Sequence, residues 1–499
     1  MLFNSYGFVF LFFPLVLAGL AFCRKAEKGF RRGESLEKIY LFAVSLIFYG
    51  WRRPEYLPVL IGSMAVNYGL CRQMEDWDAL LSKTAAASGT GREKAGRRKK
   101  GIVTWGIVFN LGLLGIFKYA DTGGFVPTGI SFFTFAQIAC LMECYRGNLK
   151  EVKALSYGLY ISFFPKMMQG PIALPGEFLE QLKEKKRSFD WERIYRNLYL
   201  FILGLSKKAL LADTFGKAAD FGYGNLAALN SGDGLIVMLS YTLQLYFDFS
   251  GYCDMAMGIA GMMGYELPLN FDSPYKASDI MDFWKRWHIT LTGFFTKYLY
   301  IPLGGNRKGK ARTYLNCLIV FFLSGVWHGA GWQFIVWGMM HGVLFVITRV
   351  WKESGKKREG GFGTGRGLRV LCVAGTFLYV NLAWIFFRAR SVKEAVTLLK
   401  TIAGFSFGRI NRELAGCFNL DEFWYVIKVL RLDNWQYAHY ILTVLFLAAA
   451  LGLVFFGKSA VRFAKEAKPG IVSALVMAVL FIWSVVSFSG VSTFLYVNF

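Results

Sequence analysis

Long apolar runs separated by short basic clusters constrain the fold of this chain more than any other feature. The basic clusters occupy residues 24–38, 83–100, 183–193, 307–312, 352–369 and 458–468. Between them lie runs of roughly 17–25 apolar residues, the length at which a helix crosses the hydrocarbon core of a bilayer. Only 18% of the residues are charged, against 55% that are hydrophobic. The pattern predicts an all-α polytopic membrane protein, with residues 1–499 forming a single transmembrane domain.

The chain carries 57 Lys and Arg against 33 Asp and Glu, a net charge of +24. Such a balance also occurs in nucleic-acid-binding proteins, whose basic residues gather on one groove or helix face. Here the basic residues lie in short loops between apolar runs, which is typical of loops on the cytoplasmic side of a membrane. We therefore expect cytoplasmic basic loops, membrane lipid as the surroundings and no nucleic-acid partner.

The order of the apolar runs predicts how the chain crosses the membrane. Three pairs of runs form hairpins, 39–50 with 56–70, 313–329 with 332–350, and 370–387 with 441–456, and the run 471–488 follows them. The first 23 residues are apolar and precede their basic cluster, which indicates a retained first span rather than a cleavable signal peptide. With every basic loop inside, both termini are expected outside.

Two stretches do not fit a simple count of crossings. Residues 100–183 and 193–307 each hold about three apolar runs between two basic loops, where an even number of crossings is required. Odd counts predict re-entrant or interfacial segments, which are tolerated at membrane depth only where protein or a cavity surrounds them. Pro165, Gly170 and Pro171 are suited to break one such segment. In total we expect about eleven membrane helices of roughly 17–25 residues each.

Polar and ionisable side chains within apolar segments cost free energy, so each is a candidate for function. In this chain they concentrate between residues 244 and 341. The side chains interpreted as lining a substrate site are Asp248, Ser250, Asp254, Trp284, Arg286, Asn306 and Trp327. We expect the two aspartates of the first run to form ion pairs with Lys285 and Arg286. The alternative is a proton relay.

Three of the four histidines fall between residues 288 and 341. Imidazole suits proton transfer near neutral pH because its unperturbed pKa is about 6.5. His328 lies about fifteen residues, or roughly 22 Å, into a hairpin that starts at a basic loop. Gly325, Gly329 and Gly331 are expected to leave room for a substrate beside its ring. His341 is interpreted as a hydrogen-bonded crosslink between helices.

No pattern of metal ligands accompanies these histidines. The sequence contains no HExxH motif, and its eight cysteines form no CxxC pair. We expect neither a metal nor a bound cofactor.

Three motifs in the same region resemble those of a known family. They read QLYFDFSGYCDMAMGIAGMMGYELPLNFDSPY from residue 244, DFWKRWHITLTGFFTKYLYIPLGG from residue 282 and GVWHGAGWQFIVWGMMHG from residue 325. Together with FNSYGFVFLFFPL, IFYGWRRPEY, GISFFTF and FFPKMMQGPI, they resemble the membrane-bound O-acyltransferase (MBOAT) family. The similarity is to the bacterial branch that contains the membrane subunit of alginate O-acetyltransferase, and it covers nearly the whole chain.

The resemblance implies an MBOAT-type helical bundle, with re-entrant or interfacial helices around a central tunnel. It implies catalytic roles for His328, in GVWHG, and for His288, in RWHIT. A hydroxyl becomes an effective nucleophile when a base accepts its proton. We expect His328 to be that base, and His288 to orient the substrate or to stabilise the oxyanion.

The implied reaction moves an acyl group from a cytoplasmic thioester, with acetyl-CoA as the expected donor, across a bacterial cell membrane. The acceptor would be hydroxyl groups of an extracytoplasmic cell-envelope polysaccharide. The resemblance also implies an extracytoplasmic partner of the SGNH type that completes the transfer. Two alternatives stay open, namely D-alanyl transfer from a carrier protein to teichoic acid and a transporter with a buried Asp/His relay.

Overall fold

The computed structural model describes residues 1–27, 35–83, 89–120, 122–183, 190–355, 366–419, 428–431, 435, 437–489 and 494–495. No strand occurs in these ranges, so the predicted all-α class is confirmed. The chain divides into two compact units, residues 1–201 with 255–268 and 493–499, and residues 202–254 with 269–492. The predicted basic loops 24–38, 83–100, 183–193 and 352–369 lie partly outside the described residues.

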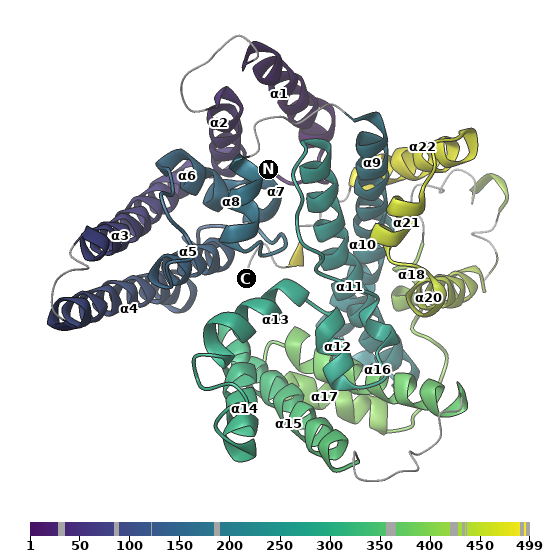
Figure 1. Ribbon diagram of the computed structural model, residues 1–499. Helices are drawn as coiled ribbons and strands as arrows, with labels where there is room; N and C mark the ends of the chain where they lie inside the picture. Colours follow the sequence, from purple (N-terminus) through teal and green to yellow (C-terminus); the bar gives the residue numbers. More distant parts are fainter. Residues whose placement is uncertain are drawn as a thin grey trace. The chain divides into compact units, whose positions relative to one another are not determined.

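The first unit is built from paired helices (Figure 1). They are the π-helix Gly7–Phe12, α1 (Phe13–Glu27), α2 (Leu36–Gly50), α3 (Leu57–Lys83), α4 (Gly89–Tyr119), α5 (Ile130–Tyr145), α6 (Ala154–Ser162), α7 (Phe164–Met167), α8 (Pro175–Lys183) and the start of α9 (Trp191–Ser206). Buried amides join three of these helices. Asn67 on α3 donates hydrogen bonds to Asn110 on α4 (3.2 Å) and to Gln137 on α5 (3.0 Å). Such bonds hold helices together where hydrophobic burial gives no preference for a partner.

One predicted irregular segment of this unit is indeed broken. Residues 155–168 divide into α6 and α7 at Phe163, with Pro165 in the first turn of α7. The N–H of Phe164, which the break frees from the helix, donates to the hydroxyl of Ser45 on α2 at 3.2 Å. Gly170 lies just after α7. Only glycine fits there without a shift, because a Cβ at that position would collide with the backbone of Lys166. The break predicted from the proline and glycine residues is therefore confirmed.

The second unit holds the rest of α9 and most of α11 (Ser231–Met262). Its other helices are the π-helix Lys207–Ala212, α10 (Asp213–Gly224), α12 (Ile280–Arg286), α13 (Ile289–Phe295), the π-helix Thr296–Tyr300, α14 (Lys310–His328), α15 (Trp332–Gly355), α16 (Arg366–Arg388), α17 (Val392–Ala403), α18 (Arg412–Gly416), α20 (Ala438–Phe456), α21 (Ala460–Glu466) and α22 (Ile471–Val486). The hairpin of α14 and α15 is tight. A Cβ on Gly338 would lie 2.5 Å from the carbonyl oxygen of Phe321, and small residues are what allow helices to approach this closely.

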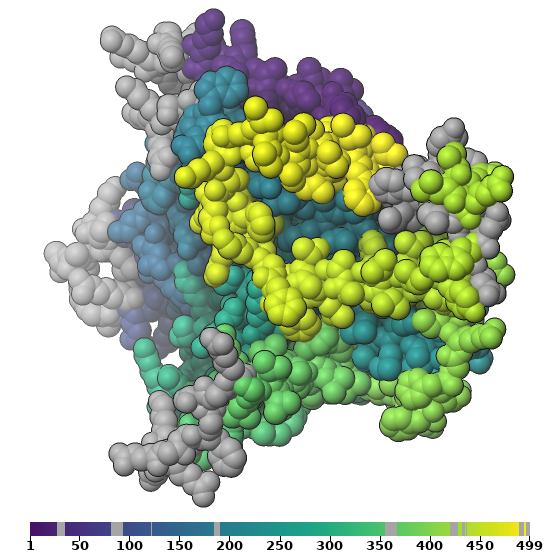
Figure 2. Space-filling model, turned by 90° about the vertical axis from the view of Figure 1, so that its right-hand side faces the viewer, coloured from purple at the N-terminus to yellow at the C-terminus, as the bar shows by residue number. Residues whose placement is uncertain are grey.

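Several helices are suited to a bilayer. In the described part of the chain, five are long and apolar enough to cross it, namely Gly7–Ala26, Glu93–Tyr119, Trp332–Ser354, Gly367–Arg388 and Ala438–Phe456, and α5 and α22 are shorter apolar helices. α20 and α22 lie on the surface shown in Figure 2, where Phe456 and Ile471 are 88% and 81% exposed. Apolar side chains exposed in this way fit lipid rather than water. The protein is therefore a multi-pass membrane protein, and the total of about eleven spans stays a prediction.

Candidate active site

His288 lies at a break between two helices. α12 ends at Arg286 and α13 begins at Ile289. Between them Trp287 is extended, and His288 adopts the left-handed conformation with φ 46° and ψ 51°. A residue other than glycine is held in this conformation at a cost of about 1–2 kcal/mol. The backbone is held there in part by the N–H of Ile289, which donates to the carbonyl oxygen of Asn270 at 3.0 Å.

The side chain of Asn270 fixes both the orientation and the tautomer of His288. Its Oδ1 atom lies 3.1 Å from Nδ1 of His288 and accepts hydrogen bonds from the backbone N–H (3.2 Å) and the hydroxyl (2.9 Å) of Thr290. A backbone N–H only donates, so this contact identifies which atom of the amide is the oxygen. An amide oxygen only accepts. In the neutral ring, Nδ1 therefore carries the proton and Nε2 carries the lone pair.

The Nε2 atom is the end of the His288 ring that is left for chemistry. The side chain is 1% exposed, and Phe249 packs edge-on against the ring with centroids 4.8 Å apart. Among the described residues, Nε2 has no hydrogen-bond partner. A buried acceptor in this state costs about 1–3 kcal/mol, and such groups are often kept for a ligand or for catalysis.

Asn270 is a site residue that the sequence interpretation did not include. It is fully buried, and its amide nitrogen donates to the sulfur of Cys253 at 3.3 Å. The available signal was an amide inside an apolar stretch, LPLNF, which is the same criterion that selected the aspartates. Its pairing with a histidine eighteen residues away becomes visible only in the folded chain.

His328 is the last residue of α14 and is 4% exposed. Its ring is surrounded by aromatic rings. The centroids of Trp327, Trp337 and Phe387 lie 4.6, 5.0 and 4.9 Å away. This histidine is therefore buried in the protein, while its predicted depth in the membrane and the predicted tunnel leading to it stay predictions.

The glycines around His328 do not leave the expected room for a substrate. A Cβ on Gly325 would lie 2.5 Å from the carbonyl oxygen of Phe334, and one on Gly329 would collide with the ring of the same phenylalanine. A Cβ on Gly331 would collide with the side chain of Gln333. The expectation of open space is therefore wrong. These glycines allow α15 to pack closely against the end of α14.

A chain of indole rings connects the surroundings of the two histidines. Trp287 is the neighbour of His288 in sequence, and its ring centroid lies 5.0 Å from that of Trp384. The ring centroid of Trp384 lies 5.7 Å from that of Trp337. Trp337 in turn contacts His328. Edge-to-face and offset ring contacts of this kind contribute about 0.5–1.5 kcal/mol each beyond the burial of area. The two histidines thus belong to one rigid aromatic core.

His341 belongs to the same core but does not form the predicted crosslink. It is fully buried on α15, and its ring centroid lies 5.2 Å from both Trp284 and Trp337. Neither of its ring nitrogens has a hydrogen-bond partner among the described residues. Ring packing, rather than a hydrogen bond between helices, holds it in place.

Asp248 is part of a buried ionic cluster. Nζ of Lys208 lies 2.7 Å from the carboxylate of Asp248 and 2.8 Å from that of Asp213. Only 2% of the Lys208 side chain and 2% of the Asp248 side chain is exposed. One ammonium group thus bridges two carboxylates. Each charge at this depth depends on its partners, because a buried ion without them is costly.

Ser250 and Asp254, two and six residues after Asp248 on α11, share a second lysine. Nζ of Lys207 lies 2.6 Å from Asp254 and donates to the hydroxyl of Ser250 at 3.4 Å. Lys207 also lies over the ring of Tyr246, 5.8 Å from its centroid. Both aspartates are therefore ion-paired in the structure.

The partners expected for the two aspartates are nevertheless wrong. Lys285 is exposed, and Arg286 has other partners. The physical reason is the π-helix Lys207–Ala212, which begins with two consecutive lysines that both contact carboxylates of α11. Gly251 allows α11 to approach this turn, since a Cβ there would lie 2.8 Å from the carbonyl oxygen of Gly204.

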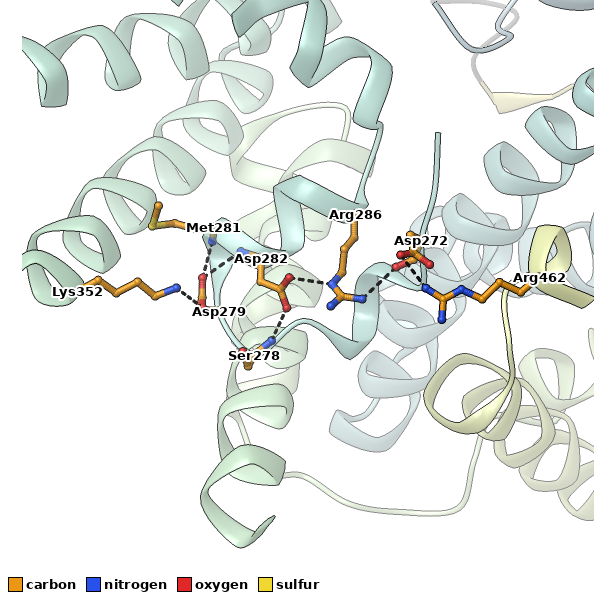
Figure 3. A network of polar contacts seen from close by, with 8 residues as sticks. All are labelled: Asp272, Ser278, Asp279, Met281, Asp282, Arg286, Lys352 and Arg462. Carbon is orange, nitrogen blue, oxygen red and sulfur yellow. Dashed lines mark hydrogen bonds and ion pairs between the residues drawn. The ribbon is translucent and has the colours of Figure 1, made fainter. Parts of the chain in front are cut away.

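Arg286 belongs to a separate polar network, drawn in Figure 3. Its Nε atom donates to the carboxylate of Asp282 at 2.8 Å, and its Nη1 atom donates to the backbone oxygen of Asp272 at 3.4 Å. Arg462 on α21 pairs with the Asp272 carboxylate at 3.3 Å. These contacts join α12 to the segment before it and to α21, so the network is structural in the first instance.

Asp279 anchors the other end of this network (Figure 3). Its carboxylate caps α12 by accepting from the N–H groups of Met281 (2.9 Å) and Asp282 (3.0 Å), and it pairs with Lys352 at 2.6 Å. Burial alone would raise the pKa of Asp279. The hydrogen bonds from Lys352 and from the two N–H groups outweigh burial and lower the pKa of Asp279 below its ordinary value.

The predicted site residues thus separate into groups. Trp284, Trp327 and His328 lie together in the aromatic core. The aspartates and Ser250 lie in the ionic clusters of α11. Asn306 is exposed in the turn that follows the π-helix Thr296–Tyr300. Within the described ranges, no group of three or more His, Cys, Asp or Glu residues is placed to hold a metal ion.

Comparison with known proteins identifies relatives of most of the chain. The model of the MBOAT, membrane-bound O-acyltransferase, family matches residues 40–356. The peptidoglycan O-acetyltransferase of Helicobacter pylori is 35% identical over 446 residues, which cover 81% of this chain and 80% of that protein. A probable alginate O-acetylase of Pseudomonas aeruginosa is 33% identical, covering 82% and 75%. The teichoic acid D-alanyltransferase of Bacillus subtilis is 28% identical, and the alignment covers 52% of this chain and 68% of that protein.

Proposed function

Because the chain belongs to the membrane-bound O-acyltransferase family, we propose that it transfers an acetyl group from acetyl-CoA to hydroxyl groups of an extracytoplasmic cell-envelope polysaccharide. Family membership makes the chain an acyltransferase, which sets aside the transporter alternative. The relatives named for O-acetylation align with four fifths of the chain, whereas the D-alanyltransferase aligns with about half. This difference in coverage favours acetyl over D-alanyl as the transferred group.

The observation that carries the proposed chemistry is the lone pair on Nε2 of His288. A hydroxyl attacks a thioester carbonyl effectively only when its proton is accepted during attack. A ring whose Nδ1 proton is engaged by Asn270 presents an acceptor at Nε2 and no donor. We therefore assign the role of general base to His288, in place of the oxyanion role that the sequence suggested for it.

His328 is the second proposed catalytic histidine. Its position in GVWHG and its burial against Trp337 support a direct role in the transfer. Proton transfer in this reaction has two parts, removal of a proton from the hydroxyl and delivery of one to the thiolate that leaves. With His288 accepting the first proton, we propose that His328, as an imidazolium, gives the second, and that the proton held by His288 restores it before the next turnover.

The direction of transfer follows from the basic loops. Loops rich in Lys and Arg on the cytoplasmic side would meet the phosphates of CoA, and both termini would lie outside. A polysaccharide acceptor outside the bacterial cell membrane then calls for an extracytoplasmic partner, which we propose to be an enzyme of the SGNH type. The family match starts at residue 40 and ends at residue 356, and this span supports the prediction of one functional domain.

The test is acetyl transfer by the purified protein in nanodiscs together with the SGNH-type partner, with radiolabelled acetyl-CoA and with peptidoglycan or alginate oligomers as acceptors. We expect His288→Ala and His328→Ala each to lower the rate about 10²–10⁴-fold, the usual contribution of a group that moves a proton. His439→Ala is the control, because His439 is bound to Asn419 (2.8 Å), beyond the residues that the family model matches. Full activity of the His288 variant would overturn the assignment of the base. Failure of the wild-type protein to release CoA would overturn the donor.

A further inference from the structure

Three neighbouring side chains of the aromatic core, here called the cage, carry buried polar atoms. Trp284 comes from α12, and Trp337 and His341 come from consecutive turns of α15. The ring centroid of His341 lies 5.2 Å from each indole, and the two indoles are 6.0 Å apart. Further rings close the cage around His341. They belong to Phe283, Phe321, Tyr379 and Trp384.

The polar atoms of this cage have no partner in the protein. The indole nitrogens of Trp284 and Trp337 and both ring nitrogens of His341 lack a hydrogen-bond partner among the described residues. The three side chains are 7%, 1% and 0% exposed, so water outside the protein does not reach them. Four such nitrogens on three side chains whose rings pack together are unusual, because native proteins pair nearly all of their buried polar groups. A ligand group is the partner that would satisfy them.

The balance of donors and acceptors indicates which kind of group fits. An indole nitrogen only donates, and a neutral imidazole has one donor and one acceptor. The cage therefore offers three N–H donors and one acceptor. A neutral group rich in acceptors matches this set, whereas a sugar hydroxyl must donate as well as accept. The walls are aromatic, and no lysine or arginine is among the cage residues, so an anion would lack a counter-charge.

Trp337 ties the cage to the proposed chemistry. One indole contacts both His341 (5.2 Å) and His328 (5.0 Å), so the cage lies one ring away from a proposed catalytic histidine. We propose that Trp284, Trp337 and His341 bind the acetyl group of the donor, with its carbonyl oxygen accepting hydrogen bonds from the cage. This inference rests on the proposed function and adds the residues that recognise the acyl group.

The experiment removes the N–H groups while it keeps aromatic bulk. Trp284→Phe, Trp337→Phe and His341→Phe are made singly. The control is Trp287→Phe, which removes the same part of an indole from the same core. The ring centroid of Trp287 lies 5.6 Å from that of Phe283 and 5.0 Å from that of Trp384. Binding is measured with S-acetonyl-CoA, which keeps the carbonyl but cannot transfer it, and with CoA itself, which has no acyl group.

We expect each cage variant to weaken binding of S-acetonyl-CoA roughly 2- to 10-fold, the effect of losing one hydrogen bond between neutral groups. Binding of CoA should not change in any variant, and Trp287→Phe should change neither. Replacing Trp337 with benzothienylalanine, which keeps the shape of indole without its N–H, should reproduce the loss if Trp337→Phe folds poorly.

Three results would overturn the inference. One is equal loss of affinity for S-acetonyl-CoA and CoA, which would indicate a general disturbance of the site. Another is unchanged affinity in all three cage variants, which would leave the cage with a packing role only. The third is no binding of either probe by a wild-type protein that still transfers acetyl groups from another thioester. Absence of any acyl transfer by the wild-type protein would instead count against the proposed function itself.

Discussion

The side-chain oxygen of Asn270 lies 3.1 Å from Nδ1 of His288, and the N–H of Thr290 identifies that oxygen as an acceptor. The protonation pattern of a buried histidine is thus set by a residue with no chemistry of its own. Orienting partners of this kind fix which ring nitrogen is left for catalysis. For this protein, they leave a lone pair on Nε2.

Asn270→Leu removes the acceptor and is expected to lower kcat about 10–100-fold, as loss of an orienting partner does at other histidines, with little change in the KM for the donor. Asn270→Asp keeps an acceptor and should retain more activity. Because a carboxylate favours the protonated ring, the acid limb of its rate profile should move to higher pH. Rate profiles of both variants against pH check this prediction. An equal loss of kcat in the two variants, with no shift of either rate profile along the pH axis, would indicate that Asn270 has a structural role alone.

Lys208→Met leaves two carboxylates in the protein without their shared counter-charge. We expect the free energy of unfolding to fall by about 3–5 kcal/mol. The double variant Lys208→Met/Asp248→Asn should recover part of this loss, because it removes one of the two carboxylates that have lost the Lys208 ammonium. Denaturation in detergent measures both. The control is Arg196→Met, since Arg196 forms an exposed pair with Glu192 (2.5 Å) and pairs of that kind contribute about 1 kcal/mol or less. An equal fall in the free energy of unfolding for Lys208→Met and Arg196→Met would contradict a stabilising role for the buried cluster.

Topology is tested by labelling from outside the cell. Single cysteines are placed at Arg97, next to a basic cluster, and at Phe407, which follows α17 and is 64% exposed. The exposed native Cys372 is replaced first. An impermeant maleimide should label Phe407→Cys in intact cells and Arg97→Cys only after lysis. Labelling in the reverse order would invert the assigned orientation, and with it the side from which the donor enters.

Acid should weaken the anchor formed by Asp279 and Lys352. The folded structure lowers the pKa of Asp279, so its stabilising effect is present above the unfolded value of about 3.9 and is lost as the pH falls through the lower folded value. Wild-type protein should therefore lose thermal stability more steeply below about pH 4 than Lys352→Met, which lacks the pair at every pH. Lys400→Met, a change at an exposed lysine of α17, is the control and should follow the wild type. Parallel curves for wild type and Lys352→Met would refute the role of the pair.

Periodic apolar runs were enough to locate most of the helices. The runs 313–329 and 332–350 became α14 and α15, and the run 370–387 became α16, because a helix long enough for the bilayer leaves a pattern that few other structures share. The breaks at residues 163 and 287–288 were predicted only as irregularity. Proline and glycine mark the first, whereas the second follows from pairing with Asn270, a contact that no local pattern encodes.

The site was predictable to the extent that it depends on residue type. A histidine or an aspartate in an apolar run is a candidate wherever it occurs. Partners depend on which helix faces meet, so the aspartates were assigned to the wrong cations when two lysines of a π-helix were nearer. The glycines near His328 show the same limit. A missing side chain creates space only if no neighbour occupies it, and Phe334 does.

The left-handed backbone at His288 has a consequence for the thermal stability of variants at this position. At ordinary positions alanine is more stable than glycine by about 0.5–1 kcal/mol, but at φ 46° the order should reverse, since only glycine adopts this conformation freely. Among inactive variants, His288→Gly should therefore outlast His288→Ala on heating. The wild-type protein carries that backbone penalty because its residue at this position has a side chain.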